Sequence, residues 1–286
     1  MSTLSERALL VSLNISVWSG RKLDKSETET VIVRNNAAKG SARVHKALLP
    51  TAKALQQITT ATGNIRTFVY KRTAPWGDGT QIMQSSGYLD FMQEYGRLKN
   101  EWEVAVSDFL YEYPQLKQRA QNALGSLFND DDYPDVADLR KRFKLDIKFL
   151  PVPNAADWRV DLGDEIVSDL RQDIERQVKA AQDAAMQSVF DRIYKVAENA
   201  HARLSDPKGR FHDSLVTNAT ELCDILPTLN IAGDKRVDAL RKVLKTTLGK
   251  HNPGTLRKDP LVRKQTADAM KRVMDKMGVF MGQPNP

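Results

Sequence analysis

The sequence predicts a mainly helical α+β protein: elongated, built from long-helix hairpins, with a small β-element and a basic helical C-terminal region. The main observation is an apolar stripe that recurs every three or four residues from 164 to 204 without a Pro or Gly. One helix over this range would be roughly 60 Å long. A second stripe of the same period runs from residue 86 to 127, and short segments of alternating polarity lie between the helices.

The first half of the chain predicts a strand, two long helices and a hairpin between them. Alternation over Leu10–Trp18 indicates a half-buried strand. A helix is expected to open near Ser26, to falter near Gly40 and to resume through Ile58, with Pro50 as a kink or as the start of a new segment. A β-hairpin is expected over residues 64–84, with strands at 65–71 and 80–83. In the helix that follows, Pro114 is expected to cause a kink or an end.

The second half predicts a short helix at 135–143, a strand at 145–149, and Trp158–Leu162 as its candidate partner strand. After the long helix come three shorter amphipathic helices, expected at residues 211–226, 235–248 and 261–277. A turn at Asp206–Gly209 separates them from the rest. The expected domains are therefore residues 1–205, an elongated helical body with the β-hairpin and short strands, and residues 206–286, the basic helical C-terminal region.

Composition places the chain among soluble globular proteins, with 41% apolar and 28% charged residues among 286. No apolar run is long enough to span a membrane, and no signal peptide is evident. The single cysteine, Cys223, has apolar neighbours and is expected to be a buried thiol. These features favour a cytoplasmic protein.

The net charge of +7 conceals three blocks of alternating sign. Residues 1–75 carry 12 Lys/Arg against 4 Asp/Glu, residues 76–230 carry 18 against 27, and residues 231–286 carry 13 against 5. Basic ends around an acidic middle indicate two kinds of partner surface, one of them for nucleic acid. The alternative is that the ends dock on the middle and neutralise it.

Two segments are candidate nucleic-acid-binding sites. The predicted hairpin interleaves cations with aromatic rings, which suits phosphate tracking and base stacking on a single strand; packing of Phe68 and Tyr70 in a core is an equal alternative. The C-terminal helices supply the largest basic field, for which a solvated helix face is an equal alternative. The candidate residues are Arg66, Phe68, Tyr70, Lys71, Arg72 and Trp76 in the first segment, and Lys235, Arg236, Arg241, Lys242, Lys245, Lys250, Arg257, Lys258, Arg263, Lys264, Lys271 and Arg272 in the second.

Enzymatic motifs are nearly absent. The sequence contains no phosphate-binding glycine loop, HExxH or paired CxxC, so no catalytic residue, metal or cofactor is predicted. Asp135, Asp146 and Lys148 form a degenerate version of the pattern with which nucleases hold Mg²⁺ and activate water. Asp146 and Lys148 as the solvent face of an alternating strand is the preferred interpretation.

Two stretches resemble an uncharacterised family of phage and prophage helical proteins: residues 13–23 (LNISVWSGRKL), and residues 133–151 from Tyr-Pro-Asp-Val to Phe-Leu-Pro. Size, layout and the basic C-terminus are also similar to the Drc family of single-stranded-DNA-binding RNA polymerase cofactors of schitoviruses. The resemblance implies an early or middle phage protein that holds unwound promoter DNA and recruits a phage-encoded RNA polymerase. It carries over no catalytic motif.

The predicted function is therefore non-catalytic binding of single-stranded DNA with little sequence preference, as a phage transcription cofactor with a possible homo-oligomeric state and no membrane association. Two alternative functions remain open: a structural or assembly oligomer built from long helical arms, and a Mg-dependent nuclease. The long helix itself, with six basic and eight acidic residues, is expected to be a spacer.

Overall fold

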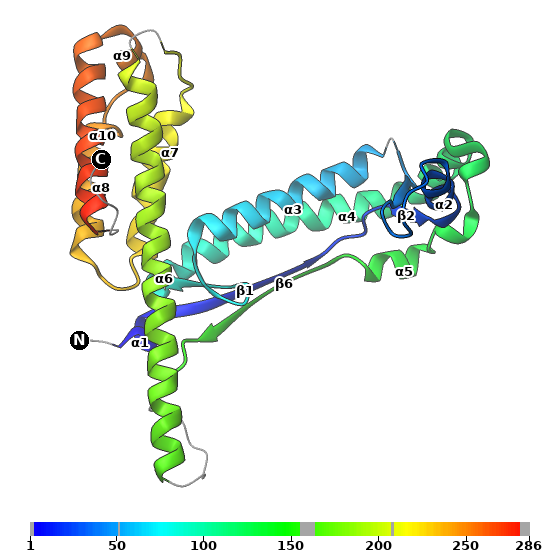
Figure 1. Cartoon of the computed structure of the whole chain (residues 1–286), viewed down its shortest axis with the longest axis horizontal. Coiled ribbons are helices and arrows are strands. Elements are labelled where there is room, and N and C mark those ends of the chain that lie inside the picture. The colour runs from blue at the N-terminus through cyan, green and yellow to red at the C-terminus, as the bar shows by residue number, and fades with distance from the viewer. Residues whose placement is uncertain (1–2, 51, 155–163, 207–208, 281–286) are drawn as a thin grey trace. The chain divides into compact units, whose positions relative to one another are not determined.

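The computed structural model describes residues 3–50, 52–154, 164–206 and 209–280 (Figure 1). The chain is mainly helical, as predicted, with a small antiparallel sheet. Its two longest helices are α6 (Asp164–Ser205, 42 residues) and α4 (Tyr88–Leu124, 37 residues). The expected strand at Trp158–Leu162 lies outside the described residues. None of the described helices is long and apolar enough to cross a membrane.

The chain forms two compact units, each assembled from separate segments. Unit 1 comprises Met1–Ser12, Tyr70–Phe91 and Lys148–Pro286, and unit 2 comprises Leu13–Val69 and Met92–Ile147. These units do not coincide with the predicted ranges 1–205 and 206–286. The physical reason is that the buried face of α6 shares one core with the helices that follow it.

In unit 1, α6 packs with α7 (Ser214–Leu229), α8 (Lys235–Thr247) and α10 (Pro260–Phe280), and the short α9 (Pro253–Lys258) joins the last two. In the C-terminal half of α6, the predicted stripe is buried at Ala185, Val189, Ile193, Ala200 and Leu204, and Val196 is half-buried. Nearer the N-terminus, Leu170, Ile174 and Val178 are only half-buried. The C-terminal half of α6 is thus the part that builds the core.

A four-stranded sheet has the order β4–β5–β1–β6, from Ala74–Gly77, Thr80–Gln84, Ala8–Ser16 and Lys144–Pro151. Strands β1 and β5 are antiparallel with Leu10 opposite Ile82, and both side chains are buried. The hairpin of β4 and β5 turns at Asp78 and Gly79, which both have positive φ (46° and 75°). Such turns suit the right-handed twist of paired strands.

Unit 2 has an aromatic core in which Trp18, Phe109, Tyr113 and Phe143 meet with ring centroids 5.7–6.1 Å apart. Its other elements are the short sheet of β2 (Arg21–Asp24) and β3 (Val44–Ala47), the helices α2 (Lys25–Arg34), α3 (Lys53–Arg72) and α5 (Val136–Lys141), and 3₁₀ turns at Gly125–Leu127 and Asp130–Asp132. A further helical turn, α1 (Leu4–Arg7), and a 3₁₀ turn at Ser85–Gly87 belong to unit 1.

Two sequence predictions were wrong in the first half: the extent of the first helix, and the first strand of the hairpin. The helix expected from Ser26 to Ile58 ends at Arg34, because Asn36 adopts a positive φ of 47° and the chain then forms β3. The helix starts at the cap Asp24, whose carboxylate accepts from the Glu27 amide. Of the two outcomes expected for Pro114, the end of the helix does not occur: α4 continues to Leu124, and Tyr113 and Leu116 stay buried on the core face.

The predicted first strand of the hairpin, residues 65–71, is instead the last part of α3. Its buried residues Ala54, Ile58, Thr62, Ile65 and Val69 recur every three or four positions, which is the helical period. Thr62 accepts a hydrogen bond of 2.9 Å from the Trp102 indole and so satisfies both polar groups within the core. The local alternation from 65 to 71 was a short coincidence within a longer helical pattern.

Candidate nucleic-acid interface

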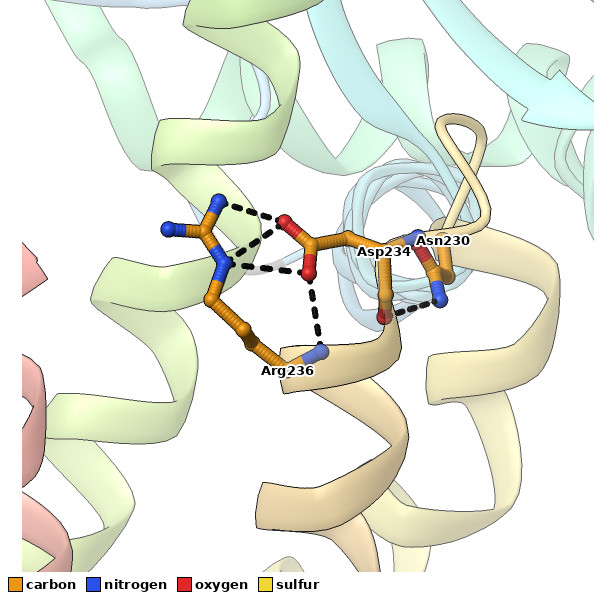
Figure 2. A network of polar contacts seen from close by, with 3 residues as sticks. All are labelled: Asn230, Asp234 and Arg236. Carbon is orange, nitrogen blue, oxygen red and sulfur yellow. Dashed lines mark hydrogen bonds and ion pairs between the residues drawn. The ribbon is translucent and has the colours of Figure 1, made fainter.

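Helix α8 begins at a polar network that fixes its first turn (Figure 2). Asn230 accepts from the Asp234 amide (2.8 Å) and donates to the Asp234 carbonyl (3.0 Å). The Asp234 carboxylate then caps the helix by accepting from the Arg236 amide at 2.8 Å, and it pairs with the Arg236 guanidinium at 2.6 Å. This hydrogen-bonded pair lowers the pKa of Asp234 and raises the pKa of Arg236.

The packing of α8 on the core of unit 1 determines which of its side chains face water. Val237, Leu240 and Leu244 are buried in the core of unit 1, as the sequence predicted for this face. Lys235, Lys242 and Lys245 lie on the opposite side and are exposed. The face therefore presents three ammonium groups, accompanied by one exposed acid, Asp238.

Helix α10 and the turn before it extend the basic surface. Met270 and Met277 are buried, while Lys264, Lys271 and Arg272 are exposed. Lys250 and Lys258 are exposed in the connection from α8 to α10. Within the described ranges, no carboxylate forms an ion pair with any of the following: Lys235, Lys242, Lys245, Lys250, Lys258, Lys264, Lys271 and Arg272.

Arg263 was predicted to bind phosphate, and the structure contradicts this. Its residue is only 8% exposed, and its guanidinium donates to the carbonyls of Leu204 (3.1 Å), Arg203 (2.9 Å), Asp206 and Gly209 (2.8 Å). These groups form the C-terminal end of α6 and the turn after it. The carbonyls at a helix end lack intrahelical partners, so Arg263 satisfies them and cannot reach a ligand.

Three other predicted arginines are also engaged by the fold. Arg241 is half-buried and donates to the Cys223 carbonyl at 2.5 Å. Arg257 pairs with Asp213 and lies over the Phe211 ring at 5.1 Å, and Arg236 lies over Phe190 at 5.2 Å. The fork-shaped guanidinium suits carbonyls and ring faces, so these arginines are engaged by other groups of the fold even where the side chain stays exposed, as at Arg236 and Arg257.

The segment from Arg66 to Trp76 does not form the predicted platform. On helix α3, Arg66 and Tyr70 are four residues apart on an exposed face, whereas Phe68 is half-buried. Trp76 lies on β4 and packs against the core of unit 1. Because residues 66–70 belong to helix α3 and not to the predicted strand, Arg66, Phe68 and Tyr70 do not line one face of a strand.

The end of α3 nevertheless leaves one aromatic ring and one lysine at the surface. Tyr70 is 48% exposed, and the Lys71 ammonium forms an exposed ion pair of 3.3 Å with Glu221. Arg72 is half-buried. Arg192 of α6, which the sequence did not single out, donates to the carbonyls of Lys71 (3.0 Å) and Thr73 (2.8 Å), and burial lowers the pKa of its guanidinium.

The nuclease residues have structural roles or face water. Asp135 caps α5 by accepting from the Asp138 amide at 2.7 Å. Asp146 and Lys148 alternate on the exposed side of β6, the arrangement preferred from the sequence. Among the residues that the structure describes, no group of three or more His, Cys, Asp or Glu is placed to hold a metal ion.

The acidic run at 130–132 is engaged by lysines of unit 2. Asp132 pairs with Lys46 at 2.7 Å, where both side chains are largely buried, and Asp130 pairs with Lys117 at 2.8 Å. These pairs hold the 3₁₀ turn against β3 and α4. The carboxylates of Asp130 and Asp132 are therefore engaged by lysines of the same unit.

Comparison with family models, with curated proteins and with solved structures gave no match. The resemblance to schitovirus cofactors stays a prediction. Function must accordingly be inferred from the residues of this chain.

Proposed function

We propose that this protein is a non-catalytic binder of single-stranded DNA with little sequence preference. The observation that supports the proposal is the set of exposed lysines on α8, α10 and their connection, which have no carboxylate partners among the described residues. Ammonium groups with this freedom neutralise phosphates and release counterions. They carry no direct information about base identity, so affinity varies little with sequence.

Tyr70 is the proposed stacking residue. Of the three aromatic residues predicted to bind bases, Tyr70 is exposed, whereas Phe68 and Trp76 are half-buried. A base in a single strand can lie on its ring, whereas bases in a duplex are already stacked on each other. A single strand is therefore the preferred ligand.

The proposed setting is a phage protein in the host cytoplasm that holds unwound promoter DNA while a phage-encoded RNA polymerase is recruited. Two observations support this setting. Residues 13–23 and 133–151 resemble a family of phage and prophage helical proteins, and residues 76–230 form an acidic block. Acidic surface stays unoccupied by DNA and is available to a protein partner.

Salt titration of DNA affinity tests the proposal. If about five phosphates are neutralised, the logarithm of the association constant falls against the logarithm of salt concentration with a slope near −3.5 for a single strand. Fluorescence anisotropy with an oligo-dT strand, a matched duplex and an RNA strand measures it. Affinity that is independent of salt, or a preference for the duplex, contradicts the proposal.

An oligomer built from helical arms is the second candidate. Val104 and Tyr111 lie seven residues apart on α4, hence on one face, and are 51% and 85% exposed. Exposed apolar side chains at this spacing suit helix pairing between copies. Light scattering that finds large assemblies, in a protein that binds no nucleic acid, favours this candidate over DNA binding.

A further inference from the structure

A groove of about 300 Å³ lies between α8 and α10 within unit 1. Its floor is aliphatic: Leu240 and Val243 come from α8, Val273 comes from α10, and Ala239 and Ala269 leave the space open because their side chains are small. On each helix the lining residues come from successive turns, at positions 236, 239/240, 243 and 247 of α8 and 269, 272/273 and 276 of α10, so the groove follows both helix axes. On α8 it extends from Arg236 to Thr247, a length of about 16 Å or three helical turns.

The rim of the groove is positively charged. Arg272 and Lys276 line it from α10 and Arg236 lines it from α8. Arg236 is held by Asp234, but neither Arg272 nor Lys276 forms an ion pair with a carboxylate of the described chain. Arg272 and Lys276 are also four residues apart on one helix, where like charges repel, so an external carboxylate between them would relieve that repulsion.

These properties select the chemistry of the occupant. A nucleic-acid base needs an aromatic face, and none of the residues that line the groove is aromatic. An aliphatic floor of three turns with cations along its edge complements a short helix that has leucine-like side chains on one face and carboxylates beside them. We infer that the α8–α10 groove binds an acidic amphipathic helix of a partner protein.

The inference is independent of DNA binding, because the groove and the exposed lysines use different faces of the same helices. None of the exposed lysines of α8 lines the groove, and Lys264 and Lys271 lie on the far side of α10 from Ala269 and Val273. A partner helix and a DNA strand can therefore be held together, with Arg272 at the boundary between the two surfaces.

A displayed library of random peptides of about 16 residues, roughly four helical turns, tests the inference on the full-length protein. Selected peptides should have apolar residues at helical spacing, flanked by Asp or Glu. Added salt should lower their affinity for the protein. A selection that yields no binder, or yields basic or aromatic-rich binders, overturns the inference.

Substitutions in the groove test whether the selected peptides bind there. The double variant Arg272→Glu/Lys276→Glu reverses two charges and should lower the affinity for the peptide at least tenfold. This is about the effect of losing a close charge pair. Ala239→Trp should block the groove from its exposed side. The matched control is Lys264→Glu/Lys271→Glu, which makes the same charge change on the outer face of α10; it should weaken oligo-dT binding and change peptide affinity by less than about twofold.

The outcomes separate the two proposals. Peptide affinity that is unchanged in Arg272→Glu/Lys276→Glu and in Ala239→Trp overturns the groove assignment, whatever the DNA result. An equal loss of peptide affinity in the control variant Lys264→Glu/Lys271→Glu also overturns the groove assignment, since the attraction would then be a general charge effect. Absence of oligo-dT binding with normal peptide binding contradicts only the proposed function.

Discussion

The segment from Arg66 to Trp76 and the helices α8–α10 are both rich in cations, yet the fold treats them differently. In the first segment, a helix and a strand draw Phe68 and Trp76 toward the interior and leave Tyr70 and Lys71 at the surface. In the second, the core takes an aliphatic stripe and Arg263, Arg241 is half-buried, and the other cations stay exposed. Charge density in the sequence thus does not say which cations are available to a ligand.

The largest expected effect concerns Arg263, a cation of α10 that stabilises the fold and is not exposed to a ligand. Arg263→Ala should lower the free energy of unfolding by about 3 kcal/mol, because buried carbonyls of the α6 terminus lose a charged donor. Urea denaturation measures this change. The neighbouring exposed variant Lys264→Ala should change the free energy by less than about 0.5 kcal/mol. Equal stability of the two variants would show that Arg263 is not a structural cap.

The next effect tests the lysine face. The triple variant Lys235→Ala/Lys242→Ala/Lys245→Ala should weaken oligo-dT binding at least tenfold and make the salt slope shallower by about 2, at about 0.7 for each phosphate contact. Fluorescence anisotropy at several salt concentrations measures both quantities.

Its control removes the same charge elsewhere. Lys25→Ala/Lys39→Ala/Lys53→Ala alters three exposed lysines of unit 2 and should leave the slope nearly unchanged. A similar loss in both triple variants would mean that net charge, rather than the α8 face, sets the affinity.

A smaller effect is expected at Tyr70. Tyr70→Ala should weaken oligo-dT binding about fivefold, the loss of roughly 1 kcal/mol from one stacked base, while Tyr70→Phe keeps the ring and the affinity. Tyr111→Ala is the matched control, since Tyr111 is also exposed on a helix. If Tyr70→Ala binds as the unaltered protein does, the first segment has no part in the site.

The smallest effect is expected at Lys71. Its ion pair with Glu221 joins side chains that are 59% and 53% exposed, so solvent screens most of the attraction. Lys71→Ala should change the free energy of unfolding by less than about 0.5 kcal/mol and oligo-dT affinity by about twofold. Chemical denaturation and anisotropy are the measurements; a large loss of stability would mean that this pair is coupled to the core.

Much of the fold was predictable from the sequence. The helices α6, α7, α8 and α10 were found within a few residues because a helical period in a long segment is a strong local signal. The inward residues of α7 and α8 followed from the same period. For the site, the sequence located the basic C-terminal region and the burial of Cys223.

Other features depended on contacts between residues far apart. Residues 65–71 alternate locally, and only the packing of Ile65 and Val69 in the core reveals that they continue a helix. The role of Arg263 required the end of α6, more than 50 residues earlier, to lie against α10. No local pattern could have indicated that neighbour.

By itself, the sequence determined where the long helices lie and how charge is divided along the chain, because helical period and composition are local properties. The tertiary structure decided which cations face water, which close helix ends, and that two alanines on α8 and α10 leave a groove between cations. These outcomes depend on which surfaces pack together, because burial forces a guanidinium to find carbonyl partners and leaves an ammonium outside in water.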